Sequence, residues 1–330
     1  MTWKTTSVTM FYTLTDLEDT STTTRTTEFY MKNGRGTLGL PNPLIVFCAP
    51  ELQPAIQAIR DELVDSAVIP TLYVCRNLQY FDFYSQNIQT IRDQRKGSSI
   101  YTKDHRNTPS YCLLTMLKIV VLQIAHQMNP FHTEMFAWID FGIQHIAADG
   151  LAEAAMKIVQ FPKPRVSVVY IHYRSRAEIG DMCQFVPGGP CGIAAGSFTV
   201  ESSYMKRFCN AMMSIFHEQL MKGVAHSEET VLTCCYDRYP ELFTLSFGDY
   251  KSICLNYHRP VESYHSVKYH FIQNAQRAGR KDLATQAALA VMDCVENGDL
   301  VLGNDEQTWL RRIIDGFFAT ATTDVKKCSI

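Results

Sequence analysis

Paired cysteines of the kind that bind zinc or form disulfides are missing from this sequence. It contains 11 cysteines, an odd number, and no two of them stand in a CxxC spacing. Several lie in apolar runs, such as Cys48 in "LIVFCAP" and Cys254 in "SICLNY", where a reduced thiol behaves as a small hydrophobic residue. The pattern argues against a disulfide framework and a structural zinc site, and it predicts a reducing, cytoplasmic location.

An excess of charge of one sign and long apolar segments are also missing. The 31 basic residues face 33 acidic ones without a strongly basic stretch, which argues against a general nucleic-acid-binding protein. No apolar run approaches the roughly 20 residues of a membrane helix, so we expect no transmembrane segment. The N-terminal stretch "MTWKTTSVTMFYTLTD" lacks the long apolar core of a signal peptide.

The sequence does contain short apolar runs that alternate with segments of helical period. With 330 residues, 46% of them hydrophobic, it can build one large α/β domain or two smaller ones. The strand–helix–strand order predicts a Rossmann-like, mostly parallel sheet flanked by helices. The expected strands are 7–14, 43–50, 69–76, 133–140, 165–174, 242–250 and 251–257, and the main expected helices are 51–65, 111–127, 203–223 and 227–240.

Two other segments have a different character. The threonine-rich stretch 15–36 is polar and is expected to be a loop, either flexible or facing a substrate. After about residue 260, strand signals disappear and a helical period continues. We therefore expect an α/β domain over residues 1–259 and a helical C-terminal extension of two or three helices over 260–330.

The stretch "FHTEMFAWIDFGIQHI" (131–146) places a carboxylate, Asp140, directly after a buried strand. Three interpretations compete. Asp140 can end the strand in a simple turn, it can belong to a kinase-like "DFG", or it can meet a metal and a phosphate in the crevice at the strand ends. Gly142 would let a bulky ligand approach the backbone. The kinase interpretation fails because no HRD loop precedes this site and no APE follows it.

Other candidate residues also have two interpretations each. Ser227 is expected to cap a helix whose first turn holds Glu228 and Glu229, which can stabilise the helix dipole or supply a general base. The glycine-rich "PGGPCGIAAGSF" (187–198) is not a P-loop, and it can form a turn or a floor for a flat, polar ligand. His258 is expected at the surface or in packing, with a metal ligand as the less favoured interpretation.

These segments together resemble the HtrL/YibB family of lipopolysaccharide-locus proteins. The resemblance rests on "NPFHTEMFAWIDFGI" (129–143), "LYVCRNLQYF" (72–81), "SEETVL" (227–232) with "YPELF" (239–243), and "GDYKSICLNY" (248–257). Members look like GT-A-type glycosyltransferases, which act on nucleotide sugars and usually carry a D-x-D motif that binds Mn²⁺ or Mg²⁺ and the diphosphate. Here Asp140 keeps the first aspartate of that motif, and Gly142 replaces the second.

The resemblance implies a role for each candidate residue. Thr13 and Arg76 would hold the nucleotide, and Asp140, with His258 completing a metal site, would bind a divalent cation. Lys118 would face the diphosphate, although a solvated lysine is an equal alternative. The segment with Gly189 and Ser197 would line the donor sugar and the acceptor. Glu228 or Glu229 would deprotonate an acceptor hydroxyl.

Two hypotheses about function follow from this reading. The first is a glycosyltransferase that moves a sugar from a nucleotide-sugar donor to a glycan or glycoconjugate acceptor. The alternative is a catalytically silent carbohydrate- or nucleotide-binding protein on the same fold. For the base we favour Glu229, because it shares a helix face with Leu232 and Thr233, and we expect Glu228 to be its solvated dipole partner.

Overall fold

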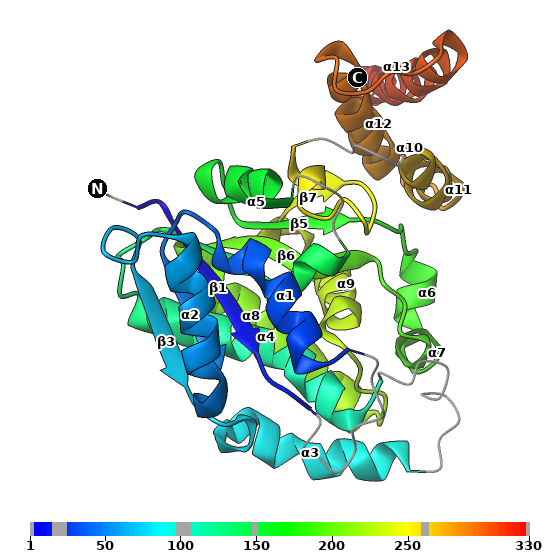
Figure 1. Cartoon of the computed structure of the whole chain (residues 1–330). Helices are drawn as coiled ribbons and strands as arrows, with labels where there is room; N and C mark the ends of the chain where they lie inside the picture. The colour runs from blue at the N-terminus through cyan, green and yellow to red at the C-terminus, as the bar shows by residue number, and fades with distance from the viewer. Residues whose placement is uncertain (1–2, 15–24, 97–106, 147–150, 259–263, 328–330) are drawn as a thin grey trace.

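A seven-stranded sheet forms the centre of the protein (Figure 1). The computed structural model describes residues 3–14, 25–96, 107–146, 151–258 and 264–327. The strand order is β3-β2-β1-β4-β6-β5-β7, and neighbouring strands are parallel except where β6 pairs with β4 and β5. The expected fold class, a mostly parallel sheet flanked by helices, is thus confirmed. The strands are β1 (Thr5–Phe11), β2 (Leu44–Cys48), β3 (Thr71–Cys75), β4 (Met135–Ile139), β5 (Val166–Tyr170), β6 (Ile193–Glu201) and β7 (Phe243–Phe247).

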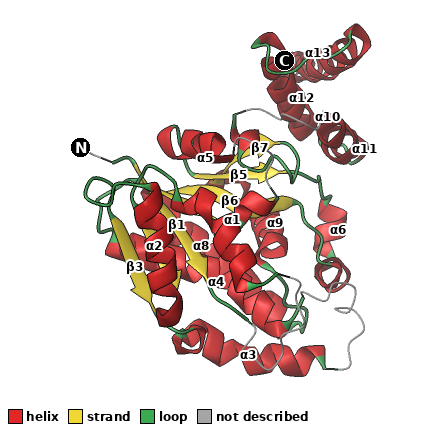
Figure 2. Ribbon diagram, in the orientation of Figure 1, coloured by secondary structure: helices red, strands yellow, loops and turns green. Residues whose placement is uncertain are grey.

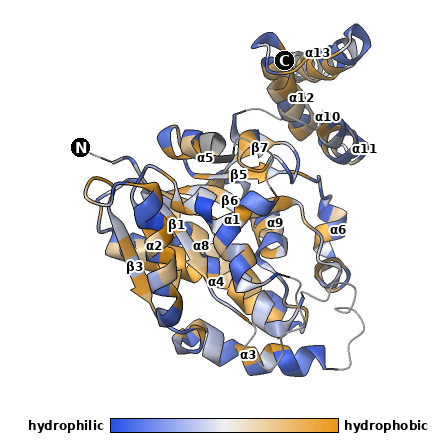
Figure 3. Cartoon of the chain, viewed as in Figure 1, coloured by the Kyte–Doolittle hydropathy of each residue, from blue (hydrophilic) through white to orange (hydrophobic). Residues whose placement is uncertain are grey.

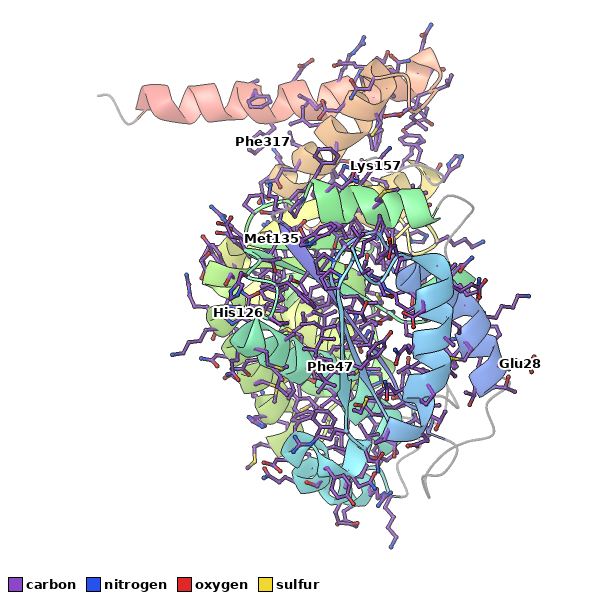
Figure 4. All side chains as sticks on the ribbon, turned by 60° about the vertical axis from the view of Figure 1, so that its left-hand side comes forward. Glu28, Phe47, His126, Met135, Lys157 and Phe317 are labelled. Carbon is purple, nitrogen blue, oxygen red and sulfur yellow. The ribbon has the colours of Figure 1, made fainter. Side chains whose placement is uncertain are left out.

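The inner strands β1, β2, β4 and β5 are buried along their whole length because helices cover both faces of the sheet. Every residue of β1, β2, β4 and β5 is buried, as expected for parallel strands covered on both sides. Figure 4 shows Phe47 of β2 in the interior and Glu28 at the outer surface. In Figure 3 the strands β3 and β7 are largely hydrophobic, whereas α3 and α6 show large hydrophilic areas.

Two helical layers enclose the sheet (Figures 1 and 2). One face packs against α4, α8 and α9, and the other packs against α1, α2 and α5. The bounds are α1 (Thr27–Leu38), α2 (Gln53–Leu63), α3 (Asp82–Arg95), α4 (Pro109–Met128), α5 (Leu151–Gln160), α6 (Arg176–Gly180), α7 (Met182–Phe185), α8 (Ser202–Met221) and α9 (Glu228–Arg238).

Helix α4 is the central helix of its layer. Thr108 caps it by accepting a hydrogen bond from the Tyr111 N–H, Pro109 opens it, and Asn129 ends it in the left-handed conformation. Among the described residues, α4 is the one helix long and apolar enough to cross a membrane. More than half of that apolar window is buried inside the protein, between the sheet and the neighbouring helices. Burial in the core therefore accounts for its composition.

The structure corrects three expectations about secondary structure. Residues 27–36 of the expected polar loop belong to helix α1 (Thr27–Leu38), which Thr26 caps, while residues 15–24 lie outside the described part of the chain. The glycine-rich segment becomes strand β6 over its second half. Residues 251–257, expected as a strand, form turns and a short 3₁₀ helix, Leu255–Tyr257.

The last of these differences has a packing cause. Ile253, Cys254 and Tyr257 are buried on the face of the sheet that α5 also covers, and the Tyr257 hydroxyl shares its one O–H donor between the carbonyls of Ser167 (3.0 Å) and Ser197 (2.9 Å). A strand would turn alternate residues away from the sheet. The compact turn instead buries three side chains and satisfies two strand carbonyls.

The C-terminal region is helical, as expected. It comprises α10 (Tyr264–Ser266), a π-helical turn (Val267–Ile272), α11 (Gln273–Arg277), α12 (Lys281–Glu296) and α13 (Asn304–Lys327). Phe271 packs against Tyr170 of β5 and Phe247 of β7, each at a ring-centroid distance of 4.8 Å. The extension therefore shares the hydrophobic core of the sheet, while α13 stands away from the sheet (Figure 1).

Candidate functional site

A cavity of about 640 Å³ opens where the parallel strands end. Thr13 follows β1, Asp140 follows β4 and His172 follows β5, and all three line it. The N-terminal turns of α4 and α9 complete the wall with Thr108 and Ser227. Crevices at the carboxyl ends of strands are the usual ligand sites of open α/β sheets, and this volume is typical of a small-molecule site.

A buried ammonium group forms the centre of the polar wall. Lys118 of α4 is 5% exposed, and its Nζ lies 2.9 Å from Asp140 Oδ1 and in short contact with Glu228 Oε1. It also donates to the Ala195 carbonyl at 3.3 Å. Burial alone would lower the pKa of Lys118, but the two carboxylates raise it above its ordinary value. The lysine is therefore a fixed positive charge inside the protein, and the solvated alternative is wrong.

Asp140 is held in place by its strand neighbours. The indole N–H of Trp138, two residues earlier on the same face of β4, donates to Asp140 Oδ1 at 2.7 Å. The Asp140 backbone N–H donates to Gly196 of β6 at 2.8 Å. Burial raises the pKa of Asp140 above its ordinary value, against the opposing effect of Lys118. The side chain is 35% exposed, so it is anchored at Oδ1 and still reaches the cavity.

The two glutamates of α9 both face the cavity, contrary to our expectation for Glu228. Glu228 is only 5% exposed and pairs with Lys118, so it is not a solvated partner of the helix dipole. The expectation assumed that neighbouring side chains on a helix must diverge. Glu228 and Glu229 are the first two residues of α9, and this end of the helix points at the cavity. Both side chains therefore reach the cavity although they leave the helix in different directions.

Glu229 has the properties of a proton acceptor. Its Oε1 accepts a hydrogen bond from the Ala195 N–H at 3.3 Å. Burial and the neighbouring charge of Glu228 raise the pKa of Glu229 to about 7. Thr233, one turn later, donates to the Glu229 carbonyl at 2.8 Å and accepts from the Gly192 N–H of the β6 approach at 3.2 Å. The expected face of α9 therefore packs on the sheet and fixes Glu229.

The remaining candidate residues divide into two groups. Thr13 and Gly189 line the cavity together with Lys118, Asp140 and the two glutamates. Arg76 is exposed and lies over the ring of Phe81 at 5.5 Å, away from the cavity wall. Ser197 is buried within β6, where its carbonyl accepts from Tyr257. His258 is exposed, and it does not contribute to the cavity either.

The residues present do not fit the divalent cation that the resemblance implied. Asp140 and His258 belong to different parts of the protein, because only Asp140 lines the cavity. Over the described ranges, no group of three or more histidine, cysteine or acidic side chains has the arrangement of a metal site. The position beside Asp140 Oδ1 already holds the ammonium of Lys118.

Several cavity residues were missed by sequence reasoning. Tyr12, beside Thr13, and His172 both follow strand ends. The rule that identified Asp140, which looks for polar residues just after the strands of a parallel sheet, therefore also identifies them. Tyr111 stands seven residues before Lys118 and thus on the same face of α4, a spacing that a search for polar residues on an apolar helix can detect. Tyr250 comes from the turn after β7 and carries no comparable signal.

The motif-like glycines near the site have packing roles. The residues "GRGTLG" (34–39) match a GxGxxG spacing, but they lie on and just after helix α1 rather than in a phosphate-binding loop. A Cβ at Gly34 would lie 2.5 Å from the ring of Phe141, which stacks on Phe11 at 4.7 Å. A Cβ at Gly142 would lie 2.9 Å from the ring of Tyr30, so the close approach there comes from a side chain.

Gly189 provides a test of how rigid the cavity wall is. Its φ of +58° is strained for other residues, and an added Cβ would lie 2.8 Å from the ring of His226, another cavity residue. We expect Gly189→Ala to lower the free energy of unfolding by about 1–3 kcal/mol, measured by denaturant titration. Gly180→Ala, where a Cβ meets nothing within 4 Å, is the matched control. Equal stability of the two variants would contradict a rigid wall.

Comparison with known proteins establishes the family. A family model described as "Bacterial protein of unknown function (HtrL_YibB)" matches residues 3–258. The chain belongs to this HtrL/YibB family. Protein HtrL of Escherichia coli strain K12 is 22% identical to it over 230 residues, which cover 68% of this chain and 78% of that protein. The resemblance seen in the sequence motifs is therefore confirmed.

Solved structures similar to this chain are remote. A 4-diphosphocytidyl-2C-methyl-D-erythritol synthase from Anaerococcus prevotii is 8% identical and covers 82% of this chain and 98% of its own, with a TM-score of 0.33. A CMP:2-keto-3-deoxy-manno-octonic acid synthetase is 8% identical, with coverages of 83% and 99% and a TM-score of 0.36. The PaToxG glycosyltransferase is 11% identical, with coverages of 95% and 84% and a TM-score of 0.34.

Proposed function

We propose that this protein is a glycosyltransferase that moves a sugar from a nucleotide-sugar donor to a hydroxyl group of a glycan or glycoconjugate acceptor. The observation that carries the proposal is Glu229, a carboxyl group with a pKa of about 7 in a cavity at the strand ends. A general base is most effective when its pKa lies near the working pH. Glu229 would remove the proton of the acceptor hydroxyl as that oxygen attacks the anomeric carbon.

The other cavity groups suit the charges of such a reaction. Glycosyl transfer passes through a transition state with oxocarbenium character, which nearby carboxylates such as those of Asp140 and Glu228 stabilise. The leaving diphosphate is an anion and needs the opposite kind of surroundings. Arg25 lines the cavity, and the N-terminal turn of α4 at Thr108 and Tyr111 presents the positive end of a helix dipole.

A second candidate is a binding protein without catalytic activity on the same fold. The ammonium of Lys118 is occupied by its protein partners, which leaves little cationic assistance for a departing diphosphate. A thermal-shift screen with UDP-, GDP- and CMP-based sugars, with and without Mn²⁺, followed by measurement of donor hydrolysis, separates the two candidates. Ligand stabilisation with turnover is expected for the enzyme. Stabilisation without turnover supports the binding protein, and no response to any nucleotide or nucleotide sugar contradicts both the glycosyltransferase and a nucleotide-binding protein.

Asp140→Asn tests the role of the strand-end carboxylate. Asparagine keeps an oxygen that accepts from Trp138 and Lys118, so we expect the fold and the melting temperature to change little. Loss of the negative charge is expected to lower kcat on the order of a hundredfold, as for other electrostatic groups at a reacting centre. Asp93→Asn on the exposed side of α3 is the control. Normal turnover by the Asp140→Asn variant would show that the charge of Asp140 does not contribute to catalysis.

A further inference from the structure

The donor atoms of Lys118 are fully used inside the protein. A lysine ammonium has three N–H donors, and Lys118 has three partners: Asp140 Oδ1, Glu228 Oε1 and the Ala195 carbonyl. No N–H remains for a phosphate oxygen. The expected contact between Lys118 and a diphosphate is therefore not supported, and the geometry makes Lys118 a positioning residue that holds two carboxylates side by side.

Glu228 has one carboxylate oxygen that lacks a partner. Its Oε1 meets Lys118, whereas its Oε2 is buried without any hydrogen bond from the described residues, in a side chain that lines the cavity. Leaving a buried carboxylate oxygen unsatisfied is costly. The two hydrogen bonds to the Asp140 carboxylate likewise both go to Oδ1. Glu228 Oε2 can therefore accept a hydrogen bond from a ligand, and Asp140 Oδ2 can accept a second one.

The charge of the cluster limits what that donor can be. One ammonium faces the carboxylates of Asp140 and Glu228, and Glu229 adds a further negative charge whenever it is ionised. The cluster is therefore negative, and an anionic diphosphate would be repelled. A divalent cation at Asp140 would lie close to the Lys118 ammonium and be repelled in turn. A neutral group rich in hydroxyl donors matches both the charge and the unused oxygens.

We infer that the Asp140–Lys118–Glu228 cluster binds the hydroxyl groups of the neutral sugar moiety of the donor. The Lys118 ammonium occupies the position beside Asp140 where a metal ion would otherwise bind. This inference rests on the proposed function and names its substrate class: a nucleotide sugar whose sugar carries at least one hydroxyl bound by Glu228 Oε2 and no negative charge. Asp140 Oδ2 accepts from a neighbouring hydroxyl. The diphosphate lies elsewhere, and binding needs no divalent cation.

The test separates the sugar from the nucleotide. Isothermal titration calorimetry measures the affinity of the wild type and of Glu228→Gln for UDP-, GDP- and CMP-based sugars and for the matching nucleotides without sugar. Glu228→Gln is expected to weaken the nucleotide sugar about 10- to 100-fold, the effect of losing a hydrogen bond to a charged group. The affinity for the nucleotide alone should stay within about twofold. Glu296→Gln, on the exposed end of α12, is the control.

Three outcomes would overturn the inference. Binding in EDTA should equal binding with Mn²⁺, and a requirement for Mn²⁺ overturns the inference. Equal weakening of nucleotide and nucleotide sugar by Glu228→Gln also overturns it. If that variant does not fold, deoxy-sugar donors are titrated into the wild type, where loss of a single hydroxyl should weaken binding to the same degree and no loss at any position overturns the inference.

The result for the proposed function is read separately. If no nucleotide or nucleotide sugar binds, the proposed function fails, and free monosaccharides are then tested by saturation-transfer NMR at millimolar concentration. A signal that depends on Glu228 supports the sugar site even so. Absence of a signal, or the same signal from the Glu228→Gln variant, overturns it.

Discussion

Glu229→Gln is expected to lower kcat by about 10²- to 10⁴-fold while leaving the affinity for the nucleotide almost unchanged. The amide is nearly isosteric with the carboxylate and can still accept from the Ala195 N–H, but it cannot take a proton from the acceptor hydroxyl. Loss of a general base has an effect of this size. Because the base acts in the transition state, the change should appear in kcat rather than in ground-state binding.

The pH dependence of the reaction rate is a second test of Glu229. Burial raises the pKa of Glu229 to about 7, and a base acts only when it is deprotonated. The rate of the wild type should therefore fall as the pH drops below about 7 and level off above it, and the residual rate of Glu229→Gln should lack this step. Glu296→Gln should behave as the wild type. A Glu229→Gln variant with normal turnover would show that another group is the base.

Lys118→Met is expected to lower the free energy of unfolding by about 3–5 kcal/mol. The substitution removes the ammonium and leaves Glu228, which is 5% exposed, beside Asp140 without a counter-ion. Uncompensated buried charges carry a penalty of this magnitude. Denaturant titration at pH 7 measures the loss. Lys206→Met on the exposed face of α8 is the control, with an expected change within about 0.5 kcal/mol.

The cause of that loss can be isolated by neutralising the partners as well. In the triple variant Lys118→Met, Asp140→Asn, Glu228→Gln, the two carboxylates that Lys118 contacts are neutral as well, and most of the stability should return because a buried ion pair contributes little against a neutral replacement. If the triple variant is as unstable as Lys118→Met, the loss comes from packing of the lysine side chain. That outcome would contradict the electrostatic role that we give to Lys118.

Sequence patterns predicted those elements whose local signals agree with their burial. The apolar runs that became β2, β4 and β5 are buried on both faces, so their composition alone identified them. Asp140 was found because a charge after such a run is unusual, and because strand ends of a parallel sheet share one edge. Ser227 lies at the N-cap of α9 as expected, although its side chain makes no capping hydrogen bond.

The elements that were missed owe their structure to tertiary contacts. Strand β6 contains Ala194, Ala195 and Gly196, which are weak strand formers. It pairs with β4 and β5, and a larger residue at Gly196 would approach Ile253 at 3.2 Å. The small residues that made this segment look like a loop are required by its crowded position. No local pattern carries that information.

The sequence indicated which residues form the candidate site but not the contacts between them. Lys118, Asp140, Glu228 and Glu229 were each identified from the sequence, and the structure brings all four to one cavity. Their mutual contacts depend on how α4 and α9 pack over the sheet. Lys118 and Glu228 are 110 residues apart in the chain, and no periodic sequence pattern relates residues at that separation. The role of the lysine as an internal counter-ion therefore emerged only from the structure.

The most direct test of the central claim is the release of nucleotide from a panel of UDP-, GDP- and CMP-based sugars, measured side by side for the wild type, Glu229→Gln and Glu296→Gln. For at least one donor, we predict release by the wild type and by Glu296→Gln, in EDTA as well as with Mn²⁺, and a rate at least about a hundredfold lower for Glu229→Gln. Absence of release from every donor, or equal rates for the three proteins, would contradict the account.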